Sequence, residues 1–408
     1  MIETLRKQYN QAFTTDRYQA MLGQIQTDWP DQLDFRIAET PVFVGRDLTR
    51  KMQQACADIV RTITAPDFKQ KTEAAIPAGQ RVPNEDAHTT FMAVDFAVCR
   101  NPETGELEPQ LIELQGFPSL YGFQPYLTET FRTHFPISDS VSHLFGLSSN
   151  AEYVQQLREL VVGDCQPEEV ILLEIYPEKQ KTRIDFALTK HYLGIDAVCL
   201  TKIKKEGRTL YYEKDGRQVR IRRIYNRLIF DELAAIPDLK TDFHLTDDVD
   251  VKWVGHPNWF FRISKFTLPL LDSPYVPKSY YLNALPGGDS PDGNVPGATD
   301  LDNYVLKPLF SFAGSGVKIH VTAADIDAIP VDERGNYLLQ RKVQYEPIVQ
   351  SPDGPVKCEI RLLFIWPKDA AEPQLVINLA RLSRGEMIGV RFNKDFDWVG
   401  GTVALFEQ

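Results

Sequence analysis

Cysteine and histidine are scarce in this sequence, whose 408 residues include five cysteines and seven histidines. The cysteines are widely separated without a CxxC pair, the histidines form no HxH or HxxxH pair, and no serine lies in a GxSxG context. These absences give little support to a structural zinc site, a redox pair, a disulfide framework or a hydrolase triad. We expect most of the cysteines to be small buried hydrophobic residues.

Long hydrophobic segments are also missing. The longest unbroken apolar run extends from Leu362 to Trp366, whereas a helix needs ~20 apolar residues to span a bilayer. The first residues are polar and of mixed charge, without the apolar stretch of a signal peptide. We therefore expect a cytoplasmic protein with no membrane partner.

The chain has no excess of basic residues. It carries 56 acidic and 45 basic side chains, for a formal net charge of −11, which argues against sequence-independent binding of nucleic acid. The most basic stretch, from Lys202 to Arg227, alternates arginines with Val219 and Ile221, which is typical of a strand with one solvated face. Nucleic acid is therefore not an expected partner, although the net charge is compatible with a local basic pocket.

The character of the sequence changes along the chain, whose length fits roughly two to three domains. Residues 1–88 contain helical patterns, such as the apolar spacing in residues 48–63. In residues 89–165, FMAVDFAVC and PQLIELQGF predict two strands around a turn, and a helix is expected over residues 151–162. We expect the first range to be a mainly helical segment and the second to be part of a core that carries the site.

Residues 166–250 show a βαβ rhythm in EEVILLEIY, TRIDFALTKHYLG and AVCLTKI. This rhythm predicts a Rossmann-like parallel sheet with helices on its faces, so the expected fold class is α/β (α+β). Asp215 and Gly216 lie between two further strand patterns and predict a hairpin. Residues 251–408 contain a Gly/Pro/Asp-rich loop at 286–299 and are otherwise dominated by strands. The strands expected there are NYVLKPL, KIHV, YLLQRKV, CEIRLLFIW, QLVINLARLS and GTVALF.

The segment with the clearest chemistry is YVLKPLFSFAGSGVKIHV. A strand delivers Lys307, a loop with Gly314 and Gly316 follows, and a second strand is expected from Val317. Small residues let backbone N–H groups approach phosphate oxygens, and the lysine supplies a positive charge. Taken alone, the pattern fits an ordinary hairpin turn equally well.

The order of elements around this segment resembles the ATP-grasp superfamily. In that superfamily, a lysine before a helix and a second lysine on a strand bind the phosphates of ATP, a glycine-rich lid covers them, and a later strand leads into the adenine hinge. The resemblance implies that Lys265 and Lys307 are the phosphate lysines. The other nucleotide contacts that it implies are Ser311, Gly314, Ser315 and Gly316 in the lid, Gln340, Arg341, Lys342 and Val343 in the hinge, and Glu346 at the ribose.

The magnesium motif of these enzymes normally follows the elements above, but here a matching motif lies near the front, in MAVDFAV and QLIELQGFPSLYGFQ. Asp95, Glu113 and Gln115 would supply oxygens for Mg²⁺. The alternative for Glu113 is a solvent-facing position on an alternating strand. This displaced order resembles circularly permuted ATP-grasp proteins, namely eukaryotic-type glutathione synthetase and the synthetase part of glutathionylspermidine synthetase.

The same resemblance implies substrate and catalytic contacts. Arg361 and Arg381 would contact the γ-phosphate and the nascent acyl phosphate. Both lie on apolar strands, and pairing with Glu359 or another acid explains them equally well. Arg391 would anchor a substrate carboxylate as well as act in catalysis. The further substrate positions are Ser119, Arg227, Gly400 and Gly401.

The activity implied is that of an ATP- and Mg²⁺-dependent ligase, which joins a small-molecule carboxylate to an amine through an acyl phosphate. Three departures stand out: Gln115 replaces the usual asparagine, Ser311 replaces a metal-binding glutamate, and the lid has two glycines instead of a run of three. They motivate one alternative, a nucleotide-binding protein without catalysis. An ATP-grasp kinase that phosphorylates a hydroxyl is a second alternative, and a homodimer is compatible with the sequence.

Overall fold

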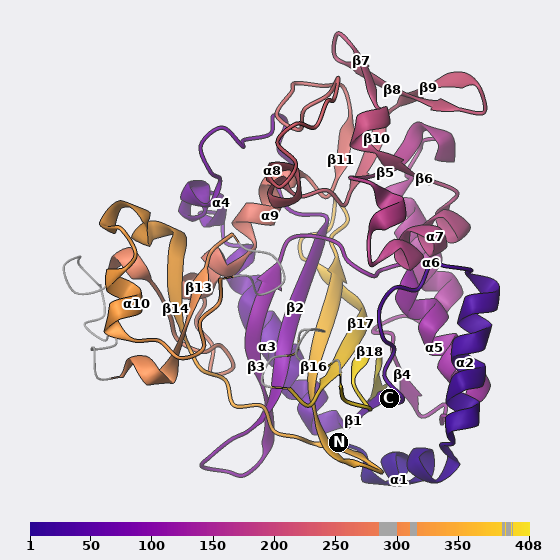
Figure 1. Cartoon of the computed structure of the whole chain (residues 1–408), viewed down its shortest axis with the longest axis vertical. Coiled ribbons are helices and arrows are strands. Elements are labelled where there is room, and N and C mark those ends of the chain that lie inside the picture. The colour runs from indigo at the N-terminus through magenta and orange to yellow at the C-terminus, as the bar shows by residue number, and fades with distance from the viewer. Residues whose placement is uncertain (285–299, 311–315, 386–387, 389–392, 394) are drawn as a thin grey trace.

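Several sheets surrounded by helices make up the computed structural model of the chain (Figure 1). It describes residues 1–408 except 285–299, 311–315, 386–387, 389–392 and 394. The five cysteines are free, and all but the half-buried Cys199 are buried, as expected. In the described part of the chain, no helix is long and apolar enough to cross a membrane.

An antiparallel sheet of long strands runs through the middle of the molecule (Figure 1). Its strand order is β18-β17-β16-β2-β3, and β15 pairs with β16 outside this path. The predicted hairpin of β2 and β3 is confirmed. The bounds are β2 Phe91–Arg100, β3 Leu107–Gln115, β15 Val349–Ser351, β16 Gly354–Ile365, β17 Gln374–Ser383 and β18 Gly400–Thr402.

Alternation along these strands separates a core face from a polar face. Phe96 and Ile360 are paired across β2 and β16 and belong to the main core, which the apolar side of helix α3 (Arg46–Ile63) completes. Asp95 and Arg361, one residue away on each strand, therefore lie on the opposite face. A register shift in β3 keeps Glu113 opposite Asp95 on that face.

A parallel sheet of order β11-β10-β5-β6 packs beside the central sheet, which confirms the predicted βαβ unit. Strand β6 lies on one side of β5 and β10 on the other, so the strand order reverses at the β5–β10 boundary. Ligands in such sheets bind outside the carboxyl ends of the strands at this boundary. The bounds are β5 Val170–Glu174, β6 Asp196–Cys199, β10 Arg223–Asn226, β11 Lys252–Val254, α6 Asn150–Val161, α7 Arg183–Leu193 and α8 Phe230–Ala234.

The hairpin predicted at Asp215 and Gly216 is present, and both residues have positive φ, 51° and 73°. Such a turn needs two left-handed residues, which Asp-Gly supplies at low cost. The hairpin extends from the end of the parallel sheet (Figure 1). The sheet that it forms contains β7 Lys204–Glu206, β8 Thr209–Lys214 and β9 Arg217–Ile221.

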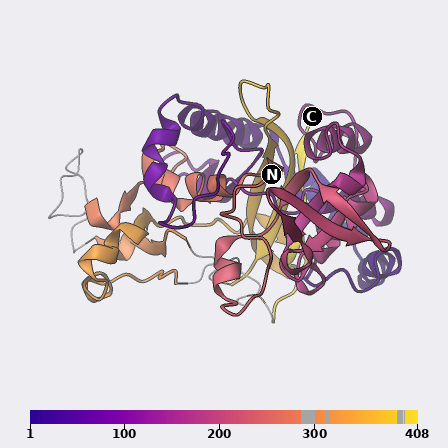
Figure 2. The same cartoon turned by 90° about the horizontal axis from the view of Figure 1, so that it is seen from above.

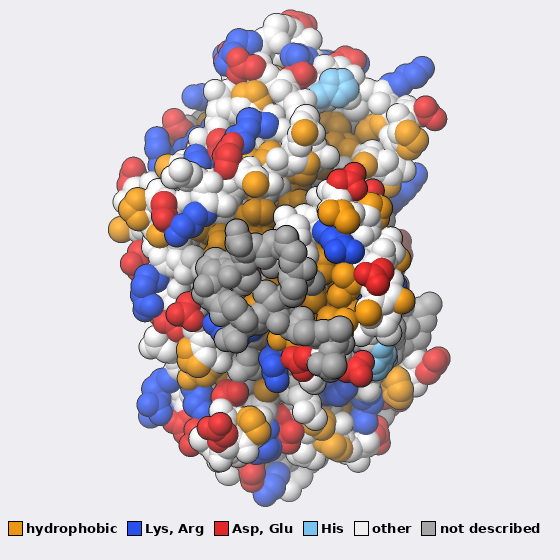
Figure 3. All heavy atoms as spheres, turned by 90° about the vertical axis from the view of Figure 1, so that its left-hand side faces the viewer, with side chains coloured by type: hydrophobic (Ala, Val, Ile, Leu, Met, Phe, Trp, Pro, Cys, Tyr) orange, Lys and Arg blue, Asp and Glu red, His pale blue; other side chains and the backbone are white. Residues whose placement is uncertain are grey.

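A small sheet of order β12-β14-β13 stands at the side of the central sheet opposite to the parallel sheet (Figures 1 and 2). Hydrophobic and charged side chains are intermixed on the face where it lies (Figure 3). The prediction of a strand at KIHV is wrong, because this segment forms only an isolated bridge between Lys318 and Leu306. The bounds are β12 Ser279–Tyr281, β13 Tyr304–Pro308, β14 Tyr337–Arg341, α9 Pro257–Arg262, the 3₁₀ helix η5 Lys265–Leu270 and α10 Ala323–Asp327.

The remaining elements join the two ends of the described chain in one sheet of order β1-β19-β4. Strand β1, in the segment expected to be helical, runs parallel to β19. This pairing brings the N- and C-terminal parts close together in both views (Figures 1 and 2). The bounds are α1 Glu3–Ala12, α2 Thr15–Asp28, β1 Val42–Val44, α4 Phe68–Lys71, α5 Phe123–His134, β4 Val141–Ser142 and β19 Ala404–Glu407.

Candidate functional site

A buried ion pair occupies the polar face of the central sheet. Arg361 donates from Nε to Asp95 Oδ1 and from Nη2 to Asp95 Oδ2, both at 2.5 Å. Asp95 is 1% exposed and Arg361 8%. Burial alone would lower the pKa of Arg361, but the facing carboxylate outweighs it and the pKa is raised. Both oxygens of Asp95 are thus taken by a guanidinium, which leaves little room for the metal ligation predicted for this residue.

Arg381 extends this cluster on the neighbouring strand. Its Nη2 contacts Asp95 Oδ2 at 3.1 Å and also bonds Glu359, which it faces across β16 and β17. Tyr345 donates from its hydroxyl to the second oxygen of Glu359 at 3.0 Å. Of the two sequence interpretations for Arg361 and Arg381, pairing with nearby acids is what the structure shows. Their contact with phosphate stays a prediction.

The two lysines predicted to bind phosphate converge on β3. Lys265 Nζ, at the start of η5, lies 3.6 Å from Glu113 Oε1. Lys307 Nζ, on β13, donates to the carbonyl of Ile112 at 3.2 Å and to Oε1 of Gln340 at 2.5 Å. Burial lowers the pKa of Lys307 to about 8, although the charge of Glu113 opposes this. Two ammonium groups from distant segments therefore contact neighbouring residues of β3, Lys265 at Glu113 and Lys307 at Ile112.

The predicted hinge residues lie at the end of β14 and just after it. Not all of them contact β3, where the two lysines meet. Gln340 is buried, and its amide Nε2 donates to the carbonyl of Leu111 at 3.3 Å, so it ties β14 to β3. Glu346 donates its backbone N–H to the carbonyl of Val98, and its carboxylate lies 3.0 Å from Arg100. The ribose role predicted for Glu346 would require that ion pair to rearrange. Arg341 is exposed, and Lys342 and Val343 are half-buried.

Part of the predicted site falls outside the described residues, namely Ser311, Gly314, Ser315 and Arg391. Gly316 is described and has a φ of +71°, and a Cβ there would lie 2.9 Å from the ring of Pro308. Glycine is therefore needed to bring the returning chain close to β13.

Gly400 and Gly401 lie in β18 beside Arg381. Gly400 has a φ of +127°, and a Cβ there would lie 2.5 Å from the carbonyl oxygen of Arg36. Gly401 donates its N–H to the same carbonyl at 2.9 Å. Close backbone packing explains both glycines without a ligand, and their contact with substrate stays a prediction.

A second cluster lies at the reversal point of the parallel sheet. Arg227, just after β10, donates to the carbonyl of Pro118, and its guanidinium lies 5.0 Å from the ring of Phe117 and 5.6 Å from that of Phe186. Its Nε has no hydrogen-bond partner among the described residues. Ser119 adjoins Pro118, so the structure brings together the two predicted substrate residues Ser119 and Arg227.

Sequence reasoning missed three acids in this cluster. Glu174 ends β5, is buried beside Glu232, and has its pKa raised to about 8 by burial, which the Arg227 charge opposes. Asp185 accepts the backbone N–H groups of Leu120, Gly122 and Phe123 and so fixes the loop that carries Ser119. An acid at the end of the apolar run EEVILLE was the available signal for Glu174.

Within the described ranges, no group of three or more His, Cys, Asp or Glu side chains could hold a metal ion. Glu113 has a side chain that is 30% exposed and approaches Lys265, and Gln115 is half-buried two residues further on β3. These two residues keep oxygens available on the polar face. A site built from the protein alone is therefore absent from this part of the chain.

Comparison with known proteins identifies the fold. No family model and no curated protein matches the chain. Among solved structures, the apo form of a glutathione synthetase-like effector (GSS30) from Globodera pallida matches with a TM-score of 0.58 and 11% sequence identity, over 99% of this chain and 97% of that one. The chain therefore has a glutathione synthetase-like fold. The permuted ATP-grasp order inferred from the motifs stays a prediction.

Proposed function

We propose that the protein binds ATP and catalyses ATP-dependent formation of an amide between a carboxylate and an amine. The observation that carries this proposal is the convergence of Lys265 and Lys307 on neighbouring residues of β3, namely Glu113 and Ile112. The two ammonium groups repel one another, and burial disfavours the charge of Lys307, so an added anion such as a di- or triphosphate would stabilise both charges. The glutathione synthetase-like fold supports a relationship to ligases.

Magnesium fits this arrangement only as an ion that arrives with the nucleotide. Mg²⁺ often binds proteins through one or two carboxylates and takes its remaining ligands from phosphate and water. Glu113 and the amide oxygen of Gln115 would hold it, while Asp95 stays paired with Arg361. The ion would neutralise negative charge on the phosphates.

The residues of the polar face would act by position and charge. Lys265 and Lys307 hold the phosphates, and the bound anion keeps Lys307 protonated. Arg381 has a side chain that is 37% exposed, and its Nε has no partner in the described part of the structure. That donor is available to a transferred phosphoryl group or to the oxygen of an acyl phosphate. Attack by the substrate carboxylate requires no covalent change of a side chain.

The second cluster would hold the organic substrate. Arg227 offers an unpartnered N–H to a carboxylate, and Glu174 with Glu232 offers acceptors to an amine. These groups lie at the reversal point of the parallel sheet, where ligands bind in open α/β sheets. A substrate with both a carboxylate and an amine, such as an amino acid or short peptide, suits this combination.

The test measures ADP release with pooled amino acids and amines, together with hydroxylamine trapping and calorimetric titration of ATP and Mg²⁺. A ligase yields ADP that depends on the carboxylate and gives a hydroxamate, whereas a kinase gives ADP without a hydroxamate. Lys307→Ala should abolish nucleotide binding. Lys318→Ala is the matched control, because Lys318 bridges the same strand but pairs with Asp325 on the surface. Unchanged ATP affinity in Lys307→Ala would refute the site.

One observation favours a second candidate, a nucleotide-binding protein without catalysis. Asp95 is sequestered by two arginines, and the described residues hold no protein-only metal cluster. Tight ATP binding without ADP release across the substrate pools is the result expected for this candidate.

A further inference from the structure

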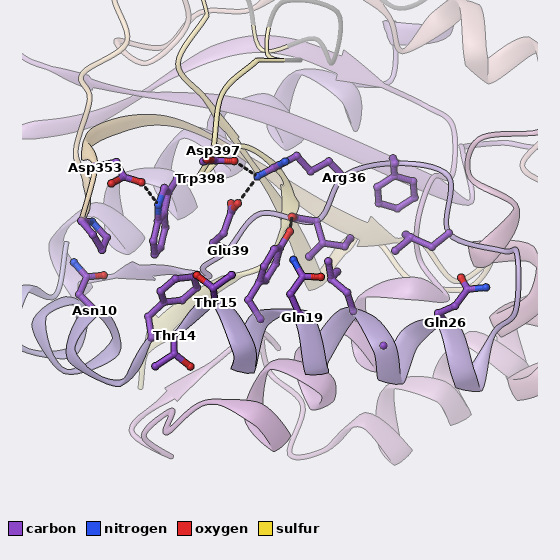
Figure 4. A pocket seen from close by; sticks show the side chains of 18 residues that line it. Asn10, Thr14, Thr15, Gln19, Gln26, Arg36, Glu39, Asp353, Asp397 and Trp398 are labelled. Carbon is purple, nitrogen blue, oxygen red and sulfur yellow. Dashed lines mark hydrogen bonds and ion pairs between the residues drawn. The ribbon is translucent and has the colours of Figure 1, made fainter.

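A cavity of about 950 Å³ lies beside helix α2, apart from both clusters described above. Figure 4 shows α2 with Gln19 and Gln26 along one side, Asp397, Trp398 and Arg36 on the other, and Glu39 between them. Its lining contains neither the phosphate lysines nor Glu113 nor Arg227. Its volume is in the range of cavities that hold small organic ligands.

Carboxylates outnumber cations in this cavity. Glu39, Asp353 and Asp397 line it, and Arg36 is the cation among the lining residues. Arg36 bonds Glu39 and reaches Asp397 at 2.9 Å, while Asp353 accepts a hydrogen bond from Trp398 Nε1 at 2.8 Å. One guanidinium therefore serves two carboxylates, and the cavity keeps an excess of negative charge that disfavours an anion.

Among the described residues, the buried lining atoms without a hydrogen-bond partner are both acceptors. Glu39, only 5% exposed, lacks such a partner for Oε2, and Asn10 lacks one for Oδ1, while the amide nitrogen of Asn10 donates to the carbonyl of Gln350. A buried acceptor without a donor is unfavourable, and a donor supplied by a ligand removes the penalty. Burial also raises the pKa of Glu39, against the charge of Arg36, as expected where cationic partners are too few.

Aromatic rings supply part of the apolar lining, together with Leu22, Leu33, Ile37 and Pro352. Phe13 and Trp398 meet with ring centroids 4.5 Å apart, and Tyr18 and Phe35 line the cavity further along α2. Tyr18 uses its hydroxyl to donate to the carbonyl of Ile37, so its ring is fixed in place. Aromatic rings beside carboxylates are a combination that recognises organic cations.

We propose that this cavity binds a small organic cation, a primary amine or guanidine carried on an aromatic or aliphatic body. The cationic group donates to Glu39 Oε2 and to the carboxylates around Arg36, and the body packs on Phe13 and Trp398. The site is separate from the proposed nucleotide site, so it is tested without ATP.

Gly23 offers a sharp way to block the cavity. It lies within α2 and lines the cavity, and a Cβ placed there would meet no heavy atom within 4 Å. Gly23→Phe fills the space without removing a polar group, whereas Gly23→Ala improves helix propensity and leaves the space open. Both variants should fold, and thermal unfolding checks this. Glu39→Gln removes the charge while keeping the shape of the side chain.

The experiment titrates the full chain with tyramine and agmatine by calorimetry, with 4-hydroxyphenylacetate as the anionic counterpart of tyramine. We expect saturable binding of at least one amine to the wild type and to Gly23→Ala, affinity about 10-fold or more weaker in Gly23→Phe and Glu39→Gln, and no binding of the anion that Gly23→Phe weakens. The proposal is overturned if neither amine binds, if Gly23→Phe weakens binding of the anion as well, or if Gly23→Phe binds the amine like Gly23→Ala.

Discussion

Asp95 and Arg361 face each other across β2 and β16, and two hydrogen bonds of 2.5 Å join carboxylate to guanidinium. Both groups are buried. Removal of one therefore leaves the charge of the other without its counter-ion and without hydration. Breaking such a pair typically costs about 3–5 kcal/mol. We therefore expect Asp95→Asn to lower the free energy of unfolding by about 3 kcal/mol, measured by urea denaturation.

Two variants make this prediction specific. Glu106→Gln breaks an exposed pair with Lys51 and should change the free energy of unfolding by less than about 1 kcal/mol. Asp95→Leu combined with Arg361→Met removes both charges together and should be less destabilising than Asp95→Asn. Wild-type stability of Asp95→Asn would contradict the buried pair.

The affinity for ATP should depend on pH through the protonation of Lys307. Its pKa is lowered to about 8, mainly by burial. As the pH rises through that value, the lysine loses the proton that gives it charge, and the attraction for phosphate falls. We expect ATP affinity to be steady at lower pH and to decrease above about pH 8, as followed by calorimetry. Lys307→Arg keeps its charge throughout, so its profile should lack this decrease.

Ionisation of the buried Glu174 should make the stability of the folded protein depend on pH. Its pKa is raised from 4.5 to about 8, first by burial. The folded state thus favours the protonated form, and this contribution is complete below pH 4.5 and lost as the pH rises through about 8. Glu174→Gln stays neutral, so its Tm should rise relative to the wild type between about pH 5 and about pH 9. Glu178→Gln, an exposed neighbour, should show no such trend.

Gly400 should be the glycine least able to accept a side chain in β18. Alanine there would combine a φ of +127° with an approach of 2.5 Å to the Arg36 carbonyl, so we expect a loss of about 3 kcal/mol in the free energy of unfolding. Gly105→Ala is the control, because its φ of +71° is also positive but no atom lies within 4 Å of the added Cβ. Its expected cost is about 1 kcal/mol. Equal losses in both variants would show that close packing is unimportant.

Local patterns predicted the elements whose partners are near in sequence. Strands β2 and β3 are joined by a short turn, and α7 connects the adjacent strands β5 and β6, so alternation and turn residues were sufficient. Lys265 and Lys307 were predicted from an order of elements that resembles ATP-grasp proteins, and the structure places Lys265 at Glu113 and Lys307 at the adjacent Ile112. The detail that Ile112 turns its carbonyl to Lys307 depends on a register shift that sequence alone does not reveal.

Elements whose pairing partners are distant in sequence were missed because local patterns carry no information about those partners. Strand β1 has three buried residues, too few to show alternation, and it exists because β19 pairs with it. A role for Glu232, in α8, could not be predicted because it depends on contact with Glu174 at the end of β5. The ion pairs of Asp95 also required the register of β2 against β16, a pairing of segments far apart in the chain.

The β1-β19-β4 sheet has a consequence for the order of events during synthesis. The side chain of Thr402 donates to the carbonyl of Thr40, 362 positions earlier, and β1 pairs only with β19 in that sheet. Until residues 404–407 have left the ribosome, β1 lacks its partner strand in that sheet, and Phe43 lacks Leu405 as a neighbour. Pairing over such sequence distances is slow. The packing of β1 therefore cannot be completed until residues 404–407 have been translated.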